Sequence, residues 1–359
     1  MVKPPLLLFL LLAAYISPKA QNTDTSRINR SASAERLLAP LKYLASDQLR
    51  GRHVGLPEID TAAQYIARQF KQAGARPVPG ATGYYQIFNY RFIRINLYPQ
   101  VATNMPLALN GLTLKNVLAF VPGTDPKLLD QYIVLSSHYD HVGVADSAVV
   151  EDGKIDSIFN GARDNATGVA AVIAAARFFV QFPPRRSVLF ICYTAEEEGE
   201  IGSKHYVNQP LVPLDRTVFN LNVDNASYNT THAICLFGLG RTTVDSLVSK
   251  ACMAYGLAVL DEPDGSESLF ERCDNYSMAR NGIPAPNFSL GMKIWDASIT
   301  DRYHRLSDEV GNMDLDYVVK FIRAYILSAQ YIANDPKRPR WTAGDPYEER
   351  WRALFKQND

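Results

Sequence analysis

Charge of one sign is not in excess in this chain of 359 residues, because 37 basic residues balance 37 acidic ones. Non-specific binding to nucleic acid or to an anionic membrane is therefore excluded. Cysteine and histidine are scarce as well, at four and six residues. The composition, 47% hydrophobic and 21% charged, is that of a globular protein and excludes a largely disordered chain.

The sequence lacks an apolar run long enough to cross a bilayer as a helix, which takes about twenty residues. A shorter run at residues 6–14 follows Lys3 and precedes small and polar residues. This arrangement is typical of a secretory signal peptide. We expect residues 1–20 to be removed by a cut after Ala20, and the mature protein to be secreted or periplasmic. The alternative is a buried N-terminal helix.

The four cysteines form an even set, and an exported protein reaches a compartment that permits disulfides. More than one pairing is possible, and the sequence leaves the choice open. Cys192 lies within an apolar run, so we expect a buried free thiol there. The chain contains no Cys-x-x-Cys pair, which argues against a zinc site built from cysteines.

The body of the chain alternates helix and strand patterns. Helical spacing of apolar residues predicts helices, the first capped by Asp60, at 61–73, 167–182, 242–255 and 315–332. Short apolar runs predict strands at 116–121, 132–136, 187–193, 217–223 and 233–237. This alternation indicates an α/β fold, a three-layer sandwich with helices on both faces of a mixed, mostly parallel sheet. We expect a single domain at 35–335 and a C-terminal tail on the surface at 336–359.

Polar residues gather next to the predicted strands, and in an open α/β sheet binding sites form beyond the carboxyl ends of the strands. Four clusters flank buried strands or the helix that follows, and a fifth lies near the C-terminus: 137–141, 160–165, 194–199, 222–225 and 303–308. Each cluster alone has an ordinary explanation as a turn, a helix cap or a solvated surface. Their shared placement favours one common site.

The residue types in these clusters are those of a zinc centre. Imidazole and carboxylate are the ligands of catalytic zinc, and the clusters hold more of them than one ion needs. One carboxylate can bridge two ions roughly 3.5–4 Å apart. Glu196 and Glu197 follow a buried strand, where adjacent side chains point in different directions, so one can bind metal while the other moves a proton. Asp140 lies two residues after His138, near enough to hold its second ring nitrogen.

Five motifs occur in a fixed order: His138-x-Asp140, Asn160-Gly161-Ala162-Arg163-Asp164-Asn165-Ala166-Thr167-Gly168, Glu196-Glu197-x-Gly199-x-x-Gly202-Ser203, Asn222-x-Asp224 and His304. In this order they resemble the zinc aminopeptidases of clan MH. That group includes bacterial leucyl aminopeptidases, aminopeptidase Y, glutamate carboxypeptidase and, as a divergent branch, glutaminyl cyclase. Residues 44–52 resemble the N-terminal opening of its exported bacterial members, and the resemblance covers roughly residues 40–335.

The resemblance implies a phosphorylase/hydrolase-like fold that binds two zinc ions. Asp164 would bridge the ions, and the other ligands would divide between them, with His138 and Asp224 at one ion and Glu197 and His304 at the other. Glu196 would be the general base, and later the general acid, for a metal-bridging water that attacks the scissile carbonyl. Asp140 would orient His138.

Some positions depart from the family pattern and bear on substrate choice: Arg163, Glu200, Asn225 and the pair Asp274-Asn275. The aminopeptidases often carry Asp in place of Arg163, whereas glutaminyl cyclases also carry Arg there. Three further histidines are interpreted as non-ligands: His141, His205 and His232. The acidic segment between His138 and Asp164 is expected to form a solvated loop.

Three functions remain open. The first is an exported two-zinc exopeptidase, an aminopeptidase that removes N-terminal residues from peptides. The second is a glutaminyl cyclase, which converts N-terminal Gln to pyroglutamate with a single zinc ion. The third is a metal-free binding protein on the same fold, against which the intact ligand set argues. Peptides are the expected substrates, and neither nucleic acid nor a membrane is an expected partner.

Overall fold

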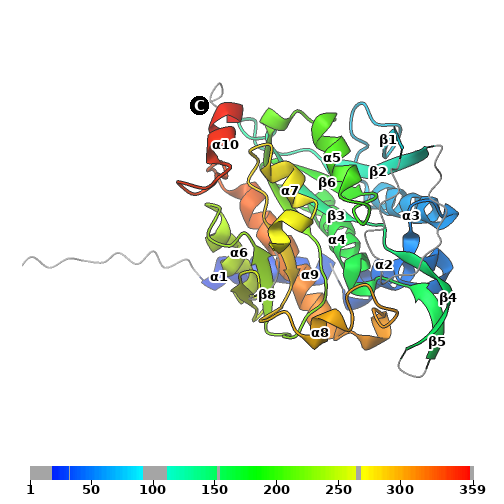
Figure 1. Ribbon diagram of the computed structural model, residues 1–359. Helices are drawn as coiled ribbons and strands as arrows, with labels where there is room; N and C mark the ends of the chain where they lie inside the picture. Colours follow the sequence, from blue (N-terminus) through cyan, green and yellow to red (C-terminus); the bar gives the residue numbers. More distant parts are fainter. Residues whose placement is uncertain (1–17, 32, 92–110, 152–153, 264–267, 356–359) are drawn as a thin grey trace, which may run out of the picture.

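The computed structural model describes residues 18–31, 33–91, 111–151, 154–263 and 268–355 (Figure 1). Most of the predicted signal peptide therefore lies outside the described residues. The strands are β1 (Tyr85–Tyr90), β2 (Leu112–Val121), β3 (Tyr132–His138), β4 (Gly143–Glu151), β5 (Lys154–Phe159), β6 (Ser187–Tyr193), β7 (Thr217–Val223), β8 (Ala233–Phe237), β9 (Ala258–Leu260) and β10 (Asn287–Leu290).

The α-helices are α1 (Pro18–Ser31), α2 (Ala34–Leu44), α3 (Pro57–Ala73), α4 (Gly168–Gln181), α5 (Ile201–Asn208), α6 (Asp245–Met253), α7 (Asn275–Ala279), α8 (Ala297–Thr300), α9 (Leu315–Asn334) and α10 (Glu348–Phe355). Shorter 3-10 or π turns are η1 (Asp47–Arg52), η2 (Ala162–Thr167), η3 (Leu214–Arg216), η4 (Leu269–Arg272) and η5 (Val310–Asn312).

An eight-stranded sheet lies at the centre, in the order β1-β2-β6-β3-β7-β10-β8-β9. Strand β3 pairs in parallel with β6 and β7, as do β7 with β10 and β8 with β9. The remaining neighbours, β1 with β2, β2 with β6 and β10 with β8, are antiparallel. The sheet is therefore mixed and mostly parallel, as predicted, with β3, β6 and β7 buried at its centre.

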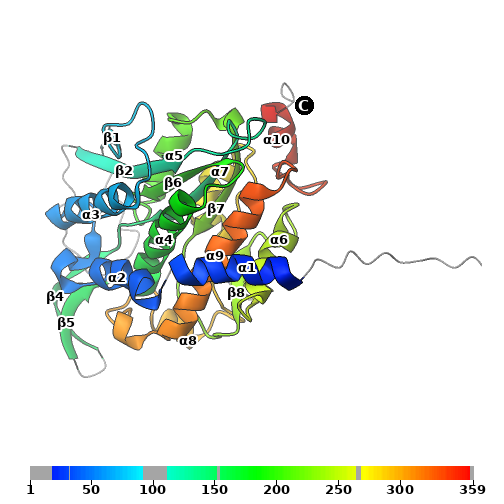
Figure 2. The same cartoon turned by 180° about the vertical axis from the view of Figure 1, so that it is seen from behind.

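Helices cover both faces of this sheet (Figures 1 and 2). Helices α3, α4 and α9 pack on one face, and α5 and α7 on the other. Helices α1 and α2 lie outside α4 and α9, and α6 packs along α9. This confirms the predicted three-layer α/β sandwich. Helices on both faces also explain why the central strands read as continuous apolar runs rather than as alternating ones.

The predicted helices and strands all occur in the structure, and β6, β7 and β8 match the predicted ranges. Strand β3 continues two residues further, to His138, and β2 begins earlier, at Leu112. Helix α3 begins at Pro57 rather than after Asp60, because a proline in the first turn loses no intrahelical hydrogen bond. Asp60 instead forms an ion pair with Lys115 at 2.6 Å.

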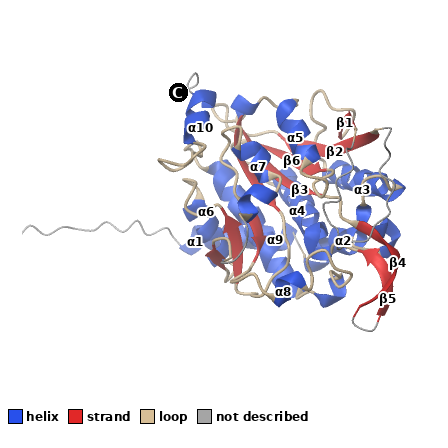
Figure 3. Cartoon of the chain, viewed as in Figure 1, coloured by secondary structure: helices blue, strands red, loops and turns tan. Residues whose placement is uncertain are grey.

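The segment between β3 and η2 is a hairpin rather than the solvated loop that the sequence suggests. Strands β4 and β5 form it, and it projects from the edge of the molecule (Figure 3). A register shift between Val144 and Val149 interrupts the pairing of the two strands. The alternation of apolar and polar residues that predicts a strand is therefore not continuous in the sequence. At its base Val142 and Phe159 pack with Leu306, so the hairpin contacts the loop that carries His304.

The residues after 335 pack against the rest of the chain instead of forming a tail apart from it. Trp341 forms a bridge with Thr242 and is 3% exposed. Helix α10 buries Trp351 and Phe355. One hydrophobic core includes side chains from Ile28 to Phe355, and so extends beyond 35–335 at both ends.

None of the described helices is both long and apolar enough to span a membrane. All four cysteines are buried free thiols, which confirms the expectation for Cys192. Burial raises the pKa of the Cys192 thiol to about 12, so this group stays protonated and unreactive near neutral pH.

Candidate metal centre

Five parts of the chain bring the predicted ligands to one end of the sheet. His138 ends β3, Glu197 follows β6 and Asp224 follows β7. Because these three strands are parallel neighbours, their carboxyl ends meet. Asp164 lies in η2, directly before α4, and His304 lies in the loop after α8. All five residues are buried.

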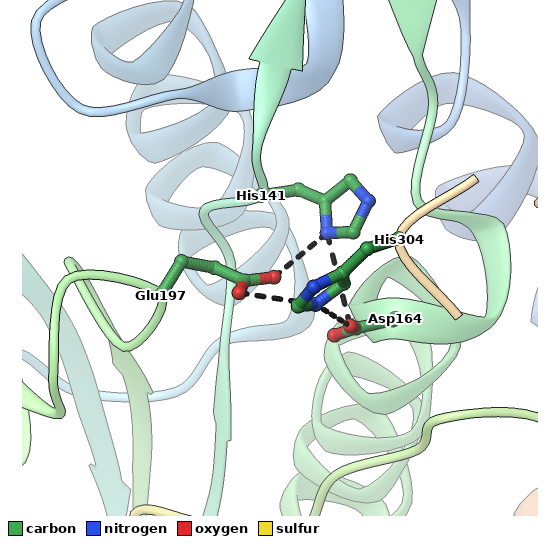
Figure 4. A group of neighbouring side chains, drawn as sticks. All are labelled: His141, Asp164, Glu197 and His304. Carbon is green, nitrogen blue, oxygen red and sulfur yellow. Dashed lines mark hydrogen bonds and ion pairs between the residues drawn. The ribbon is translucent and has the colours of Figure 1, made fainter. Parts of the chain in front are cut away.

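Asp164 connects two groups of ligands. Its Oδ1 lies 3.2 Å from His138 Nε2, and the same nitrogen is 3.1 Å from Asp224 Oδ1. Its Oδ2 lies 3.0 Å from His304 Nε2, and that nitrogen is 3.2 Å from Glu197 Oε2 (Figure 4). The structure therefore brings all five predicted ligands together, and one oxygen of Asp164 faces each group.

His141, which was predicted to be a non-ligand, lies in the second group. Its Nδ1 is 2.8 Å from Glu197 Oε1 and 3.9 Å from Asp164 Oδ2 (Figure 4). One ligand atom from each of His141, Asp164, Glu197 and His304 lies within 4.8 Å of the others. The sequence does carry a signal, namely a second histidine in the cluster that begins with a predicted ligand.

The Asp140 carboxylate binds the turn after β6. It accepts hydrogen bonds from the backbone N–H groups of Glu196, at 3.1 Å, and Glu197, at 3.2 Å. His138 Nδ1 lies closer to the Asp140 backbone carbonyl, at 3.2 Å, than to the Asp140 carboxylate, at 3.8 Å. The expected support of His138 therefore comes from the carbonyl of Asp140, whereas its carboxylate orients the two glutamates.

Asp308 holds the loop that carries Asp164. Its carboxylate accepts the backbone N–H of Arg163, at 3.0 Å from each oxygen, and that of Asp164, at 3.1 Å. It also pairs with the Arg163 guanidinium at 2.9 Å. Arg163 donates to the Asn312 carbonyl at 2.7 Å and lies over the Tyr228 ring. The arginine that departs from the aminopeptidase pattern is thus held by structural partners.

Arg52, from the N-terminal motif, joins the two loops that carry ligands. It is 1% exposed, and its guanidinium donates to the carbonyls of Tyr139 at 2.8 Å, Asn160 at 2.7 Å and Gly161 at 3.0 Å, and to that of Leu44. The Tyr139 carbonyl directly follows His138 at the end of β3. The carbonyls of Asn160 and Gly161 precede Asp164 in η2. Burial lowers the pKa of Arg52 to about 10, so it remains charged near neutral pH.

Residues 116–328, more than half of the chain, match the model of peptidase family M28. The chain belongs to peptidase family M28. Over 258 residues it is 25% identical to the alkaline phosphatase isozyme conversion protein of Escherichia coli (strain K12), which covers 68% of this chain and 70% of that protein. The M28 chain spans less than half the length of the fungal relatives that it also matches.

Solved structures share the fold of this M28 protein. An aminopeptidase from Aneurinibacillus sp. strain AM-1 superposes with a TM-score of 0.61 at 18% identity, over 88% of this chain and 97% of that one. A glutaminyl cyclase from Porphyromonas gingivalis superposes with a TM-score of 0.61 at 15% identity, over 83% of this chain and 97% of the cyclase. The chain is therefore a zinc metallopeptidase by family, on a fold that aminopeptidases and glutaminyl cyclases share.

The charges of the M28 centre hold protons on its histidines. Burial by itself lowers the pKa of His138, but the nearby carboxylates of Asp224 and Glu196 outweigh burial and hold that pKa well above its usual value. Burial is outweighed in the same way at His304, where Glu197 is the main opposing charge, and the pKa rises to about 10. The ligand groups therefore attract positive charge strongly.

The donor set of the M28 centre fits zinc. Imidazole and carboxylate ligands bind zinc at about 2.0–2.2 Å, so neighbouring ligand atoms of a tetrahedral ion lie roughly 3.3 Å apart. The imidazole nitrogens of His138 and His304 lie 3.0 to 3.2 Å from their carboxylate neighbours. In addition, Nδ1 of His138 donates to a backbone carbonyl, which is the support that a metal-binding imidazole usually has.

A pocket opens beside the centre. Three of the residues that line it are carboxylates of the centre, namely Asp164, Glu196 and Asp224. The other lining residues are mostly aromatic or apolar: Asn225, Ala226, Phe237, Leu269, Arg272, Cys273, Trp295 and Tyr303. A substrate in this pocket would contact both the proposed metal ligands and an apolar wall.

Proposed function

We propose that this protein is a two-zinc exopeptidase, an aminopeptidase that removes N-terminal residues from peptides. The observation that carries the proposal is the position of Asp164, whose two oxygens face two separate groups of ligands. A carboxylate shared in this way can bridge a pair of neighbouring ions. His138 and Asp224 would complete one zinc site, and Glu197 and His304 the other.

Two bound zinc ions would polarise the scissile carbonyl and lower the pKa of the attacking water. Glu196 would accept the proton of that water and pass it to the leaving amine. Its position supports this role, because Glu196 lines the pocket and its backbone N–H is fixed by Asp140 at 3.1 Å. Burial, with Asp224 and Glu197 nearby, raises the pKa of Glu196 well above its usual value. Bound cations would lower it again.

The lining of the pocket supports the choice of an aminopeptidase. A peptide N-terminus carries a positively charged amine next to a side chain of variable polarity. Carboxylates of the centre and apolar side chains line the same pocket, so an amine and an apolar side chain can both be accommodated. We further propose export to the periplasm or the outside, which rests on the sequence of residues 1–20 alone.

The test is the metal content of the purified mature protein together with its substrate range. Elemental mass spectrometry after dialysis against trace zinc is expected to give about two zinc ions per chain. Aminoacyl anilides are expected to be hydrolysed, and the same anilides with an acetylated amine are expected to be inert. One zinc per chain, with cyclisation of an N-terminal Gln peptide and no hydrolysis, would establish the cyclase instead. A protein that binds no zinc would contradict both enzymes.

Zinc binding is expected to release protons. His138 and His304 both have a raised pKa, about 10 for His304, so both carry a proton near pH 7 without metal. Zinc binds neutral imidazole, so each histidine must lose its proton, and the zinc affinity should rise as pH rises through the neutral range. Titration calorimetry in buffers of different ionisation enthalpy should show at least two protons released as both sites fill, one from each histidine. A heat independent of the buffer would contradict the assignment of these two ligands.

A further inference from the structure

We propose that His141 is a positioning residue for the second metal site, where it holds Glu197 by a hydrogen bond and does not itself bind metal. This inference rests on the proposed two-zinc function. His141 Nδ1 donates to Glu197 Oε1 and leaves Glu197 Oε2 directed at the ligand nitrogen of His304 (Figure 4). The imidazole thereby determines which oxygen of Glu197 is available to the ion.

The two oxygens of Glu197 have different neighbours. Oε1 lies 2.8 Å from His141 Nδ1, a short contact typical of a donor bound to a carboxylate. Oε2 lies 3.2 Å from His304 Nε2, the spacing that also separates the other ligand pairs. Without a donor at Oε1, the glutamate could turn about its terminal bond and offer either oxygen, or both, to the ion.

The surroundings of His141 favour a donor over a ligand. A metal-binding imidazole usually donates its second N–H to a carbonyl or carboxylate, as His138 does toward Asp140. The Nε2 atom of His141 is buried and has no hydrogen-bond partner among the residues that the structure describes. If Nδ1 bound metal, the ring proton would lie on Nε2, and this buried N–H group would have no acceptor. A buried N–H without an acceptor costs more free energy than a buried nitrogen lone pair without a donor. Nδ1 is also 3.9 Å from Asp164 Oδ2, whereas His304 Nε2 is 3.0 Å from it.

The backbone next to His141 leaves space for its ring because residue 161 is a glycine. Gly161 has a φ of +58°, and a Cβ atom there would lie 2.5 Å from His141 Cδ2 and 2.6 Å from its Cγ. The His141 backbone N–H donates to the Arg52 carbonyl at 3.4 Å, and its ring packs edge-on against that of His304, with centroids 5.5 Å apart. The ring is thus held from several sides, and Nδ1 faces Glu197.

The test compares two variants of similar size in the full-length mature protein. In His141→Asn, the side-chain amide keeps an N–H near the position of Nδ1, whereas His141→Leu fills the space without a donor. Zinc affinity is measured by competition with a chelator, and stoichiometry by elemental analysis. The leucine variant is expected to bind the second zinc about 10–100-fold more weakly, the usual effect of losing a partner that orients a ligand. The asparagine variant is expected to stay close to the wild type.

Equal affinity in the leucine variant and the wild type would overturn the proposal, and so would an equal loss in both variants, since a ligand cannot be replaced by the asparagine donor. If the leucine variant does not fold, nitrogen-15 NMR of the zinc-loaded wild type decides the matter. A proton on Nδ1 of His141 supports the donor role, and a metal-bound Nδ1 refutes it. If the wild type binds only one zinc ion, the two-zinc function is contradicted. The zinc affinities of the leucine and asparagine variants for that one ion would still test the role of His141.

Discussion

Replacing Glu196 with Gln is expected to lower kcat by about 10²–10⁴-fold, the usual contribution of a general base, while both zinc ions remain bound. The amide keeps the size of the side chain but cannot accept the proton of the attacking water. Glu196 faces the pocket with its turn fixed by Asp140, and its carboxylate is not part of the two ligand groups that share Asp164. Steady-state kinetics on an aminoacyl anilide and elemental analysis of the same preparation provide the two measurements.

A matched control lies two residues further along the chain. Glu198 pairs with His53 at 3.2 Å and does not belong to either ligand group, so Glu198→Gln makes the same chemical change beside the proposed base. Turnover by that variant is expected to stay near normal. If the Glu196 variant hydrolysed peptides as fast as the Glu198 variant, the assignment of the base would be wrong. Loss of zinc from the Glu196 variant would indicate a ligand rather than a base.

Replacing Asp164 with Asn is expected to remove both zinc ions and with them nearly all activity. An amide presents one oxygen and one N–H group, so it cannot offer an oxygen to each of two ions as the carboxylate does. The oxygens of Asp164 now lie 3.2 Å from His138 Nε2 and 3.0 Å from His304 Nε2. Elemental analysis after dialysis should find less than one zinc per chain, and circular dichroism should show that the variant is folded.

The partner variant is Asp224→Asn, because Asp224 contacts only the His138 group. This substitution is expected to weaken the binding of one zinc ion and to leave the binding of the other unchanged, so the protein should retain about one zinc per chain. Similar zinc contents in the Asp164 and Asp224 variants would argue against a bridging role for Asp164. Two zinc ions in the Asp164 variant would remove the basis for the shared site.

The sequence predicts five of the eight strands of the central sheet, and it does so best where a strand is buried on both faces; β1, β9 and β10 were not predicted. Strands such as β6 and β7 are continuous apolar runs, and each is followed by the polar residues that the parallel topology brings together. Three of the five proposed ligands could be found in this way because they follow such runs, whereas Asp164 precedes the predicted helix at 167–182 and the family resemblance supplies His304. What these residues do when metal is bound stays a prediction that the experiments above address.

The remaining contacts depend on backbone turns that leave no periodic signal. His141 reaches Glu197 because the chain turns after His138. The backbone N–H of His141 donates to the backbone carbonyl of Arg52, 89 positions earlier in the chain. The Asp140 carboxylate was expected at His138, yet the same turn directs it to the backbone of Glu196. In these cases the residue types were visible in the sequence, but the partner of each group was not.

Arg52 has a consequence for moving this centre into another protein. The region recognisable as an M28 peptidase begins at residue 116, so the arginine lies outside it. The carbonyl groups of Tyr139, Asn160 and Gly161 all accept a hydrogen bond from this one side chain. A transplant that copied the ligand motifs alone would leave those carbonyls without that donor and remove a positive charge from behind the carboxylates. A designed scaffold that hosts the two loops would need to supply a cation from a third, distant segment.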